Sequence, residues 1–74
     1  MAEHTIDARG LQCPAPIMRL FVLMKTAQSG DLVTITATDQ GFIKDVAAWC
    51  HKTGHTLEAV DEADGLITAR IIKG

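Results

Sequence analysis

The order of apolar and polar residues in the first part of the chain predicts a strand followed by a helix. A weak alternation centred on Ile6, from His4 to Ala8, predicts a short strand that ends at the turn Arg9-Gly10. Beyond Pro16, apolar residues recur at the spacing of an amphipathic helix, and Ser29-Gly30 is expected to end it. The apolar stripe of this helix comprises Ile17, Leu20, Phe21, Met24 and Ala27.

The middle of the chain predicts a second strand and a second helix. The run from Leu32 to Thr38 is rich in β-branched residues and has a period of two, which predicts a half-buried strand. Its apolar face would consist of Val33, Ile35 and Ala37, with threonines on the other face. The second helix follows Asp39-Gln40-Gly41 and ends at Gly54. Its apolar residues are Ile43, Val46, Ala47 and Cys50, with Phe42 and Trp49 beside them.

The last part of the chain completes the predicted fold. Strands from His55 to Asp61 and from Leu66 to Lys73 are expected to form a hairpin through Asp64-Gly65, with the turn type left open. The order strand, helix, strand, helix, strand, strand predicts an α/β fold. Two helices that both cover one face of a four-stranded sheet give a two-layer sandwich. Right-handed crossovers make part of the sheet parallel and the hairpin makes part antiparallel, so the sheet is mixed. We expect Trp49 to be at least partly buried and residues 1–74 to form a single domain.

The composition is that of an ordinary globular protein. Hydrophobic residues make up 47% and charged residues 22% of the 74 residues, a balance that excludes intrinsic disorder. A formal net charge of -2, with no basic run, argues against direct binding to nucleic acid. No apolar stretch approaches the roughly 20 residues that cross a bilayer, and the N-terminus lacks the layout of a signal peptide. We therefore expect a cytoplasmic protein with reduced cysteines and no membrane contact.

Cys13 is the main candidate for chemistry. It precedes Pro14, which suits a first helical position, so its side chain is expected at or near the helix N-cap. The partial positive charge of a helix start favours a thiolate, which predicts a Cys13 pKa below the ordinary value of about 8.5. Because Pro14 and Pro16 have no N–H, Ala15 is the one backbone donor among the first three helical residues. Gly10 permits the turn into this loop.

The roles of Arg9 and of the two cysteines have alternatives. Arg9 lies in the turn before Cys13 and could stabilise a thiolate or a persulfide there, although a solvated surface arginine is an equal alternative. Cys13 could itself be a small core residue, but its loop position favours exposure. Cys50 continues the apolar stripe of the second helix and is predicted to be core.

The remaining polar residues do not predict a metal site or an acid–base pair. His51 and His55 have metal-like spacing near Cys50, but Gly54 interrupts the helix that would align them. Asp39 and Asp45 flank the start of the second helix, where capping is the expected role. We expect no metal, nucleotide or flavin cofactor.

The residues Arg9-Gly10-Leu11-Gln12-Cys13-Pro14-Ala15-Pro16 resemble the Cys-Pro-x-Pro signature of the TusA/SirA family of sulfur carriers. Later segments also resemble that family, so the likeness covers nearly the whole chain. They are Gly30-Asp31-Leu32, Thr38-Asp39, Lys44-Asp45-Val46 and Thr53-Gly54-His55. The resemblance implies that Cys13 bears the sulfur, that Pro14 and Pro16 are the prolines of the motif, and that Gly10 is its glycine. It implies the same two-layer fold and gives no role to Cys50.

The resemblance also implies a function for the chain. Members of the family act as sulfurtransferases, which accept sulfane sulfur as a persulfide from a cysteine desulfurase or a rhodanese-like protein. They pass it to an acceptor protein, for tRNA 2-thiolation, sulfur oxidation or selenium metabolism. We expect a monomer that forms transient complexes, to which an exposed patch with Met18 and Val22 could contribute, although packing at the edge of the core is an equal alternative. The competing hypothesis is a regulatory or nucleic-acid-binding module without sulfur chemistry.

Overall fold

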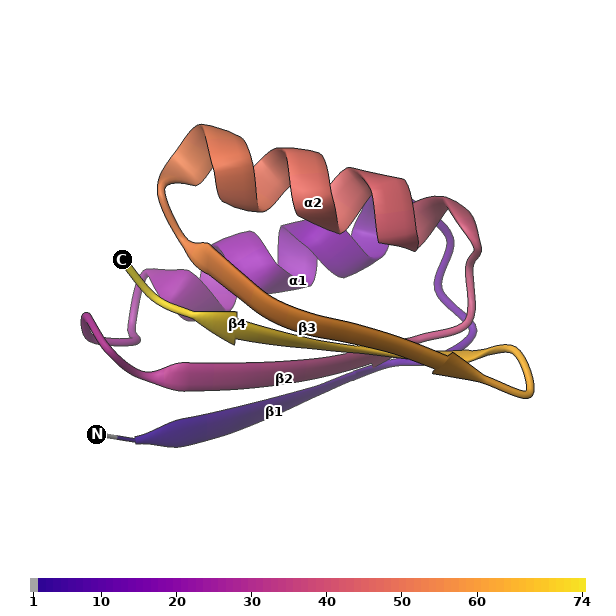
Figure 1. Ribbon diagram of the computed structural model, residues 1–74, viewed down its shortest axis with the longest axis horizontal. Helices are drawn as coiled ribbons and strands as arrows, with labels where there is room; N and C mark the ends of the chain where they lie inside the picture. The colour runs from indigo at the N-terminus through magenta and orange to yellow at the C-terminus, as the bar shows by residue number, and fades with distance from the viewer. Residues whose placement is uncertain (1) are drawn as a thin grey trace.

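A four-stranded sheet with two helices on one face forms the body of the molecule in the computed structural model, which describes residues 2–74 (Figure 1). The elements in chain order are β1 (Glu3–Ala8), α1 (Ala15–Met24), β2 (Leu32–Ala37), α2 (Gly41–Thr53), β3 (Thr56–Ala63) and β4 (Leu66–Ile72). This is the predicted two-layer α/β sandwich. Within residues 2–74, no helix has both the length and the apolar character needed to cross a membrane.

The strands lie in the order β1-β2-β4-β3. β1 and β2 are parallel, in a register that pairs Ile6 with Ile35, because α1 carries the chain back over the sheet between them. β4 runs antiparallel to both β2 and β3, so the sheet is mixed, as predicted. The β3–β4 hairpin turns at Asp64 and Gly65, whose φ angles of 53° and 78° are those of a type I′ turn.

The core lies between the sheet and the two helices. Along β2 the alternation predicted from sequence is confirmed, because Val33, Ile35 and Ala37 are fully buried while the threonines between them are partly exposed. Full burial of an apolar side chain such as Ile35 stabilises the fold by about 1.5–3 kcal/mol. The buried hydrophobic residues are Ala8, Leu20, Met24, Ala27, Val33, Ile35, Ala37, Phe42, Val46, Cys50, Ile67, Ala69 and Ile71.

The first helix differs from its prediction at two places. It ends at Met24, before Ser29-Gly30. The N–H groups of Lys25 and Thr26 donate to the carbonyls three residues before them, and Thr26 Oγ1 also donates to the carbonyl of Leu23 at 3.0 Å. Phe21, predicted as part of the core stripe, is 54% exposed. The buried residues of the helix are Pro16, Leu20 and Met24, which are four positions apart. Phe21 therefore lies on the flank, where Lys25 Nζ is 4.7 Å from the centre of its ring.

The second helix buries a similar row, composed of Phe42, Val46 and Cys50. Ala47, predicted in the stripe, is exposed, since one step of 100° past Val46 takes it off the face that meets the sheet. Trp49 is partly buried against the core, as expected, and its ring centroid is 5.2 Å from that of His55. Gly54 ends the helix with φ 83° and donates its N–H to the carbonyl of Cys50.

One buried carboxylate holds together the end of the sheet where β1 and β2 begin. Asp31 accepts the N–H groups of Ala2 and Gln28, each at 3.0 Å, and lies 3.0 Å from Nε2 of His4. The N–H of Gln28 and the contacts with His4 and Ala2 hold the pKa of Asp31 well below its usual range. This network therefore attaches the start of β1 to the turn before β2.

Candidate functional site

Cys13 lies at the end of the sheet where the parallel strands β1 and β2 finish and where both helices begin (Figure 1). Its side chain is partly buried and packs against the core, so it is less exposed than the loop position suggested. Cys50, by contrast, is 2% exposed and belongs to the core, as predicted. Of the two cysteines, Cys13 is the one within reach of another molecule.

The start of α1 does not offer its backbone donors to the sulfur. The helix begins at Ala15 and its N-cap residue is Pro14, so Cys13 lies one position before the cap, and the Cys13–Pro14 peptide bond is cis. The N–H of Ala15 donates to the carbonyl of Gln12 at 2.9 Å. Pro14 is exposed and Pro16 is fully buried under the helix. The single donor expected to face the thiol is therefore already occupied.

Asp39, which follows β2, joins the cysteine loop to the start of α2. Its Oδ2 accepts the backbone N–H of Cys13 at 2.8 Å, and its Oδ1 accepts the N–H of Gly41 at 3.3 Å. Its carbonyl accepts the N–H of Phe42 at 3.0 Å. The N–H of Cys13, the Cys13 side chain and the N–H of Gly41 together lower the pKa of Asp39. Asp39 thus accepts the N–H of the first residue of α2, although the N-cap residue is Gln40, and Asp45 lies inside the helix and does not cap it as predicted.

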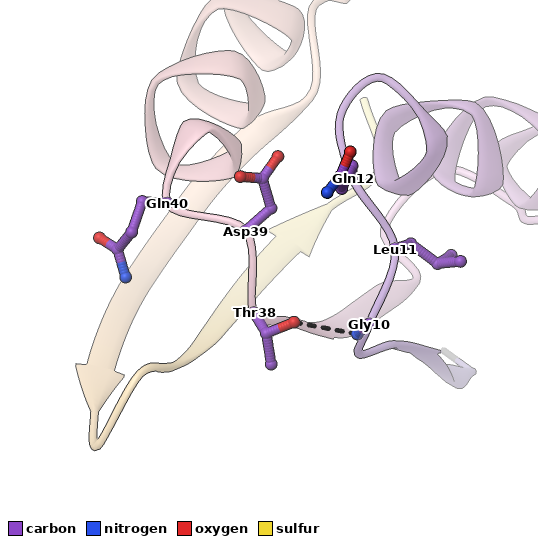
Figure 2. A pocket seen from close by; sticks show the side chains of 6 residues that line it. All are labelled: Gly10, Leu11, Gln12, Thr38, Asp39 and Gln40. Carbon is purple, nitrogen blue, oxygen red and sulfur yellow. Dashed lines mark hydrogen bonds between the residues drawn. The ribbon is translucent and has the colours of Figure 1, made fainter.

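A second hydrogen bond joins the loop after β1 to the segment after β2, closer to the ends of these strands. The N–H of Gly10 donates to Oγ1 of Thr38 at 2.9 Å, as the dashed line in Figure 2 shows. Gly10 has a φ of 80°, which a residue with a side chain rarely adopts, and this explains the glycine at this position. Figure 2 also shows the Asp39 carboxylate pointing toward the Gln12 loop, while Leu11 points away from it. The two loops border a hollow of about 390 Å³.

The environment of the sulfur is acidic. Burial, together with hydrogen bonding to the carboxylates of Asp45 and Asp39 and their negative charge, raises the pKa of Cys13 to about 12. The prediction of a lowered pKa is therefore wrong. It considered the start of α1 alone, whereas the fold adds two carboxylates, Asp39 from the segment before α2 and Asp45 from α2 itself.

Arg9, predicted as a supporting residue, is engaged elsewhere. Its Nε and Nη2 donate to the two carboxylate oxygens of Asp7, each at 2.9 Å. This pairing lowers the pKa of Asp7 to about 2 and raises that of Arg9. Within residues 2–74 no hydrogen bond or ion pair joins Arg9 to Cys13, so the arrangement matches the alternative of a surface arginine.

Sequence reasoning missed Asp39 and Asp45 as neighbours of the cysteine. A signal was available, because the carboxyl ends of neighbouring parallel strands meet at one edge of a sheet. The segment after β1 carries Cys13 and the segment after β2 carries Asp39. Their parallel pairing therefore brings a thiol and a carboxylate together from positions 26 residues apart.

The chain is similar to known proteins over nearly its whole length. The family model of sulfurtransferase TusA matches residues 4–73. A protein of Neisseria meningitidis named "Putative sulfur carrier protein" is 43% identical over 68 residues, which cover 92% of each chain. "Putative sulfur carrier protein YrkI" of Bacillus subtilis is 41% identical over 64 residues, 85% of each chain.

Among solved structures, a SirA-like protein from Desulfitobacterium hafniense superposes with a TM-score of 0.83 at 25% sequence identity. The superposition covers 96% of this chain and 97% of that one. The structural agreement thus extends over nearly the whole length of both chains. The chain belongs to the TusA family of sulfur carrier proteins.

Proposed function

We propose that the protein carries sulfane sulfur as a persulfide on Cys13, which it receives from a donor protein and delivers to an acceptor protein. The observation that supports this most directly is the contrast between its two cysteines. Cys50 is a buried residue of α2, whereas Cys13 lies in the loop where β1 and β2 end and both helices begin. A partner can reach Cys13 without any rearrangement of the core.

The proposed transfer is a pair of thiol exchange steps. The thiolate of Cys13 attacks the outer sulfur of a donor persulfide, the donor S–S bond breaks, and the donor leaves as a thiolate while Cys13 becomes Cys13-S-SH. The proton lost by Cys13 goes to solvent and can return to the donor thiolate. An acceptor thiolate then repeats the step on the Cys13 persulfide. No oxidant or reductant is consumed, because the sulfur moves with its oxidation state unchanged.

Cysteine desulfurases and rhodanese-like proteins are the donor classes that this chemistry fits, since both present a protein persulfide. The acceptor is a protein cysteine in tRNA 2-thiolation or in sulfur oxidation, and the protein works in the cytoplasm as a monomer that forms transient complexes. Gly10, Pro14, Ala15 and Pro16 serve by shaping the loop: the glycine makes the turn, and Pro16 anchors the helix start in the core. Arg9 contributes to the surface around the loop.

Docking is proposed to use the outer face of α1. Met18 and Val22 are each 62% exposed and Phe21 is 54% exposed, so three large apolar side chains face solvent on the helix that begins two residues after Cys13. We call these three residues the α1 patch. A donor or acceptor protein that covers the α1 patch would place its own sulfur at the loop, and burial of the patch would supply binding free energy.

The experiment that tests this function is a sulfur-loading assay. The protein is incubated with a cysteine desulfurase and cysteine, or with a rhodanese and thiosulfate, and mass spectrometry locates the added sulfur before and after treatment with reductant. We expect reductant-labile sulfur on Cys13, and none on Cys13→Ser, because a serine hydroxyl cannot form a persulfide. Loading of Cys13→Ser, or no loading from either donor type, would overturn the proposal. Salt-sensitive binding to nucleic acid would then favour the competing regulatory module.

A further inference from the structure

A carboxylate, and not a cation, is the charged group that holds the cysteine loop in place. Asp39 lies two residues after the end of β2, and its side chain points toward the loop that follows β1. One oxygen binds the backbone N–H of Cys13 at 2.8 Å and the other binds the N–H of Gly41. A single side chain therefore connects the reactive residue to the first turn of the other helix.

We propose that Asp39 is a positioning residue for the sulfur transfer: it fixes the backbone of Cys13 against the start of α2 and keeps a negative charge beside the sulfur. This inference rests on the proposed function. It assigns a role in the transfer to a residue outside the Cys-Pro-x-Pro segment. It also gives a reason why Cys13 of the free protein should react slowly with thiol reagents.

The positioning part follows from the hydrogen bonds. The loop from Arg9 to Pro14 has few other attachments, chiefly the bond of Gly10 to Thr38 and the turn bond of Leu11 to Ala8. Asp39 supplies the attachment at Cys13 itself. A charged acceptor makes this bond about twice as strong as a neutral one. Loss of the carboxylate would therefore release the reactive residue while leaving the sheet and the helices intact.

The electrostatic part follows from which charges face the sulfur. Asp45 faces it from α2 and Asp39 faces it from the loop before α2, whereas Arg9 of its own loop is paired with Asp7. A raised pKa leaves a smaller thiolate fraction at neutral pH, and the greater nucleophilicity of a more basic thiolate recovers only part of that loss. Free Cys13 should therefore react more slowly than an ordinary exposed thiol.

The two parts can be separated with two substitutions at one position. Asp39→Asn keeps a side-chain oxygen that can accept the N–H of Cys13 but removes the charge. Asp39→Ala removes both the acceptor and the charge. Glu3→Gln is the matched control, because it removes one carboxylate at the start of β1, the opposite end of the sheet from Cys13. Circular dichroism and thermal melts establish that each variant is folded.

Two measurements are made on each protein. The rate of Cys13 alkylation by iodoacetamide is followed against pH by mass spectrometry, and sulfur loading from the donor protein is timed. Asp39→Asn should alkylate at least fivefold faster than wild type at neutral pH, with its midpoint moved to lower pH, and should load sulfur at least as fast as wild type, because the same thiolate attacks the donor persulfide. Asp39→Ala should show the same change in alkylation but load at least tenfold more slowly than Asp39→Asn. Glu3→Gln should match wild type in both.

The outcomes distinguish this inference from the proposed function. If wild type loads sulfur and both Asp39 variants keep its alkylation profile and loading rate, Asp39 is not a positioning residue. If the two variants lose loading equally while their alkylation profiles stay at wild type, its role is structural only and the inference is wrong. Should Asp39→Ala fail to fold, the alkylation profile of Asp39→Asn against pH decides whether the charge of Asp39 acts on Cys13. A failure of wild type to load would overturn the proposed function, while the alkylation profiles would still decide the electrostatic part.

Discussion

Arg9 and Asp7 form a two-pronged ion pair on the surface, in which both nitrogen–oxygen distances are 2.9 Å. The pair spans two residues, from the end of β1 into the turn, and both side chains are more than half exposed. An exposed pair of this kind contributes little to folding stability. Its significance is that the cation nearest to Cys13 in sequence is directed away from it.

The first prediction concerns this pair. Arg9→Ala should leave the pH midpoint of Cys13 alkylation where it is in wild type, because the guanidinium does not act on the sulfur. The same substitution should raise the pKa of Asp7 from about 2 toward its ordinary value of 3.8. Alkylation profiles and an NMR titration of the Asp7 carboxyl measure the two effects. An upward shift of the Cys13 midpoint would restore Arg9 as a residue that stabilises the thiolate.

The second prediction concerns acid stability. The pKa of Asp31 is lower in the folded protein than in the unfolded chain, so its contribution to stability is present above the unfolded value of about 3.9 and is lost as the pH falls toward the folded value. Asp31→Asn removes this contribution. We expect the urea midpoint of wild type to fall between pH 5 and pH 2, and that of Asp31→Asn to be lower at pH 5 and to change less over the same range.

The control for this acid effect is Asp61→Asn, which removes an exposed carboxylate from β3. It should keep the wild-type dependence of the urea midpoint on pH. If Asp31→Asn falls with pH as steeply as wild type does, the acid sensitivity comes from carboxylates other than Asp31, and the network at the start of β1 matters less than its hydrogen bonds indicate.

The third prediction separates docking from chemistry. Met18→Gln replaces one apolar member of the α1 patch with a neutral polar side chain of similar size, so the charge around Cys13 does not change. Sulfur loading from a donor protein should slow about fivefold or more, as for a contact residue worth about 1 kcal/mol, while alkylation by iodoacetamide stays at the wild-type rate. Ala48→Gln, on the exposed face of α2, is the matched control. Equal loading by both variants would exclude Met18 from the docking surface.

The fourth prediction concerns the buried cysteine. Cys50→Ser places a hydroxyl in a core position that is 2% exposed, so the free energy of unfolding should fall by about 1 kcal/mol or more. Sulfur loading on Cys13 should persist in the folded fraction. Cys13→Ser should show the opposite pattern, with loading lost and the unfolding midpoint close to wild type. Urea denaturation and the loading assay measure both. Loss of loading in a folded Cys50→Ser protein would show that the two thiols work together.

Most of the fold could be predicted because its signals are local. The period of two in β2, the helical spacing around Leu20 and Val46, and the glycine at position 54 each report on a few neighbouring residues, and all agree with one architecture. The errors concern helical residues that were predicted to be buried and are exposed. Phe21 and Ala47 have the right spacing, and the packing of the helices against the sheet leaves them outside.

The position of Cys13 in the loop before the first helix could be predicted from sequence, whereas the charge around its sulfur could not. Cys13 stands out because of the prolines around it, which is information within one segment. The charge around its sulfur comes from Asp39 and Asp45, which the parallel pairing of β1 and β2 brings to it from the next unit of the chain. A helix start read from sequence alone predicts the opposite sign for the pKa shift. The direction of the Cys13 pKa shift therefore depends on tertiary structure, because the pairing of β1 with β2 decides which carboxylates lie near the sulfur.

The two bonds between the loops connect residues 28 and 26 positions apart, so they exist only when β1 has paired with β2. A chain in which β1 has not yet docked, during synthesis or after partial melting, carries a cysteine with ordinary solution reactivity. Alkylation of Cys13 in urea should therefore accelerate once β1 detaches from β2. The cysteine that we propose as the sulfur carrier would then expose immature or damaged copies of the protein to any oxidant or thiol-reactive agent around them.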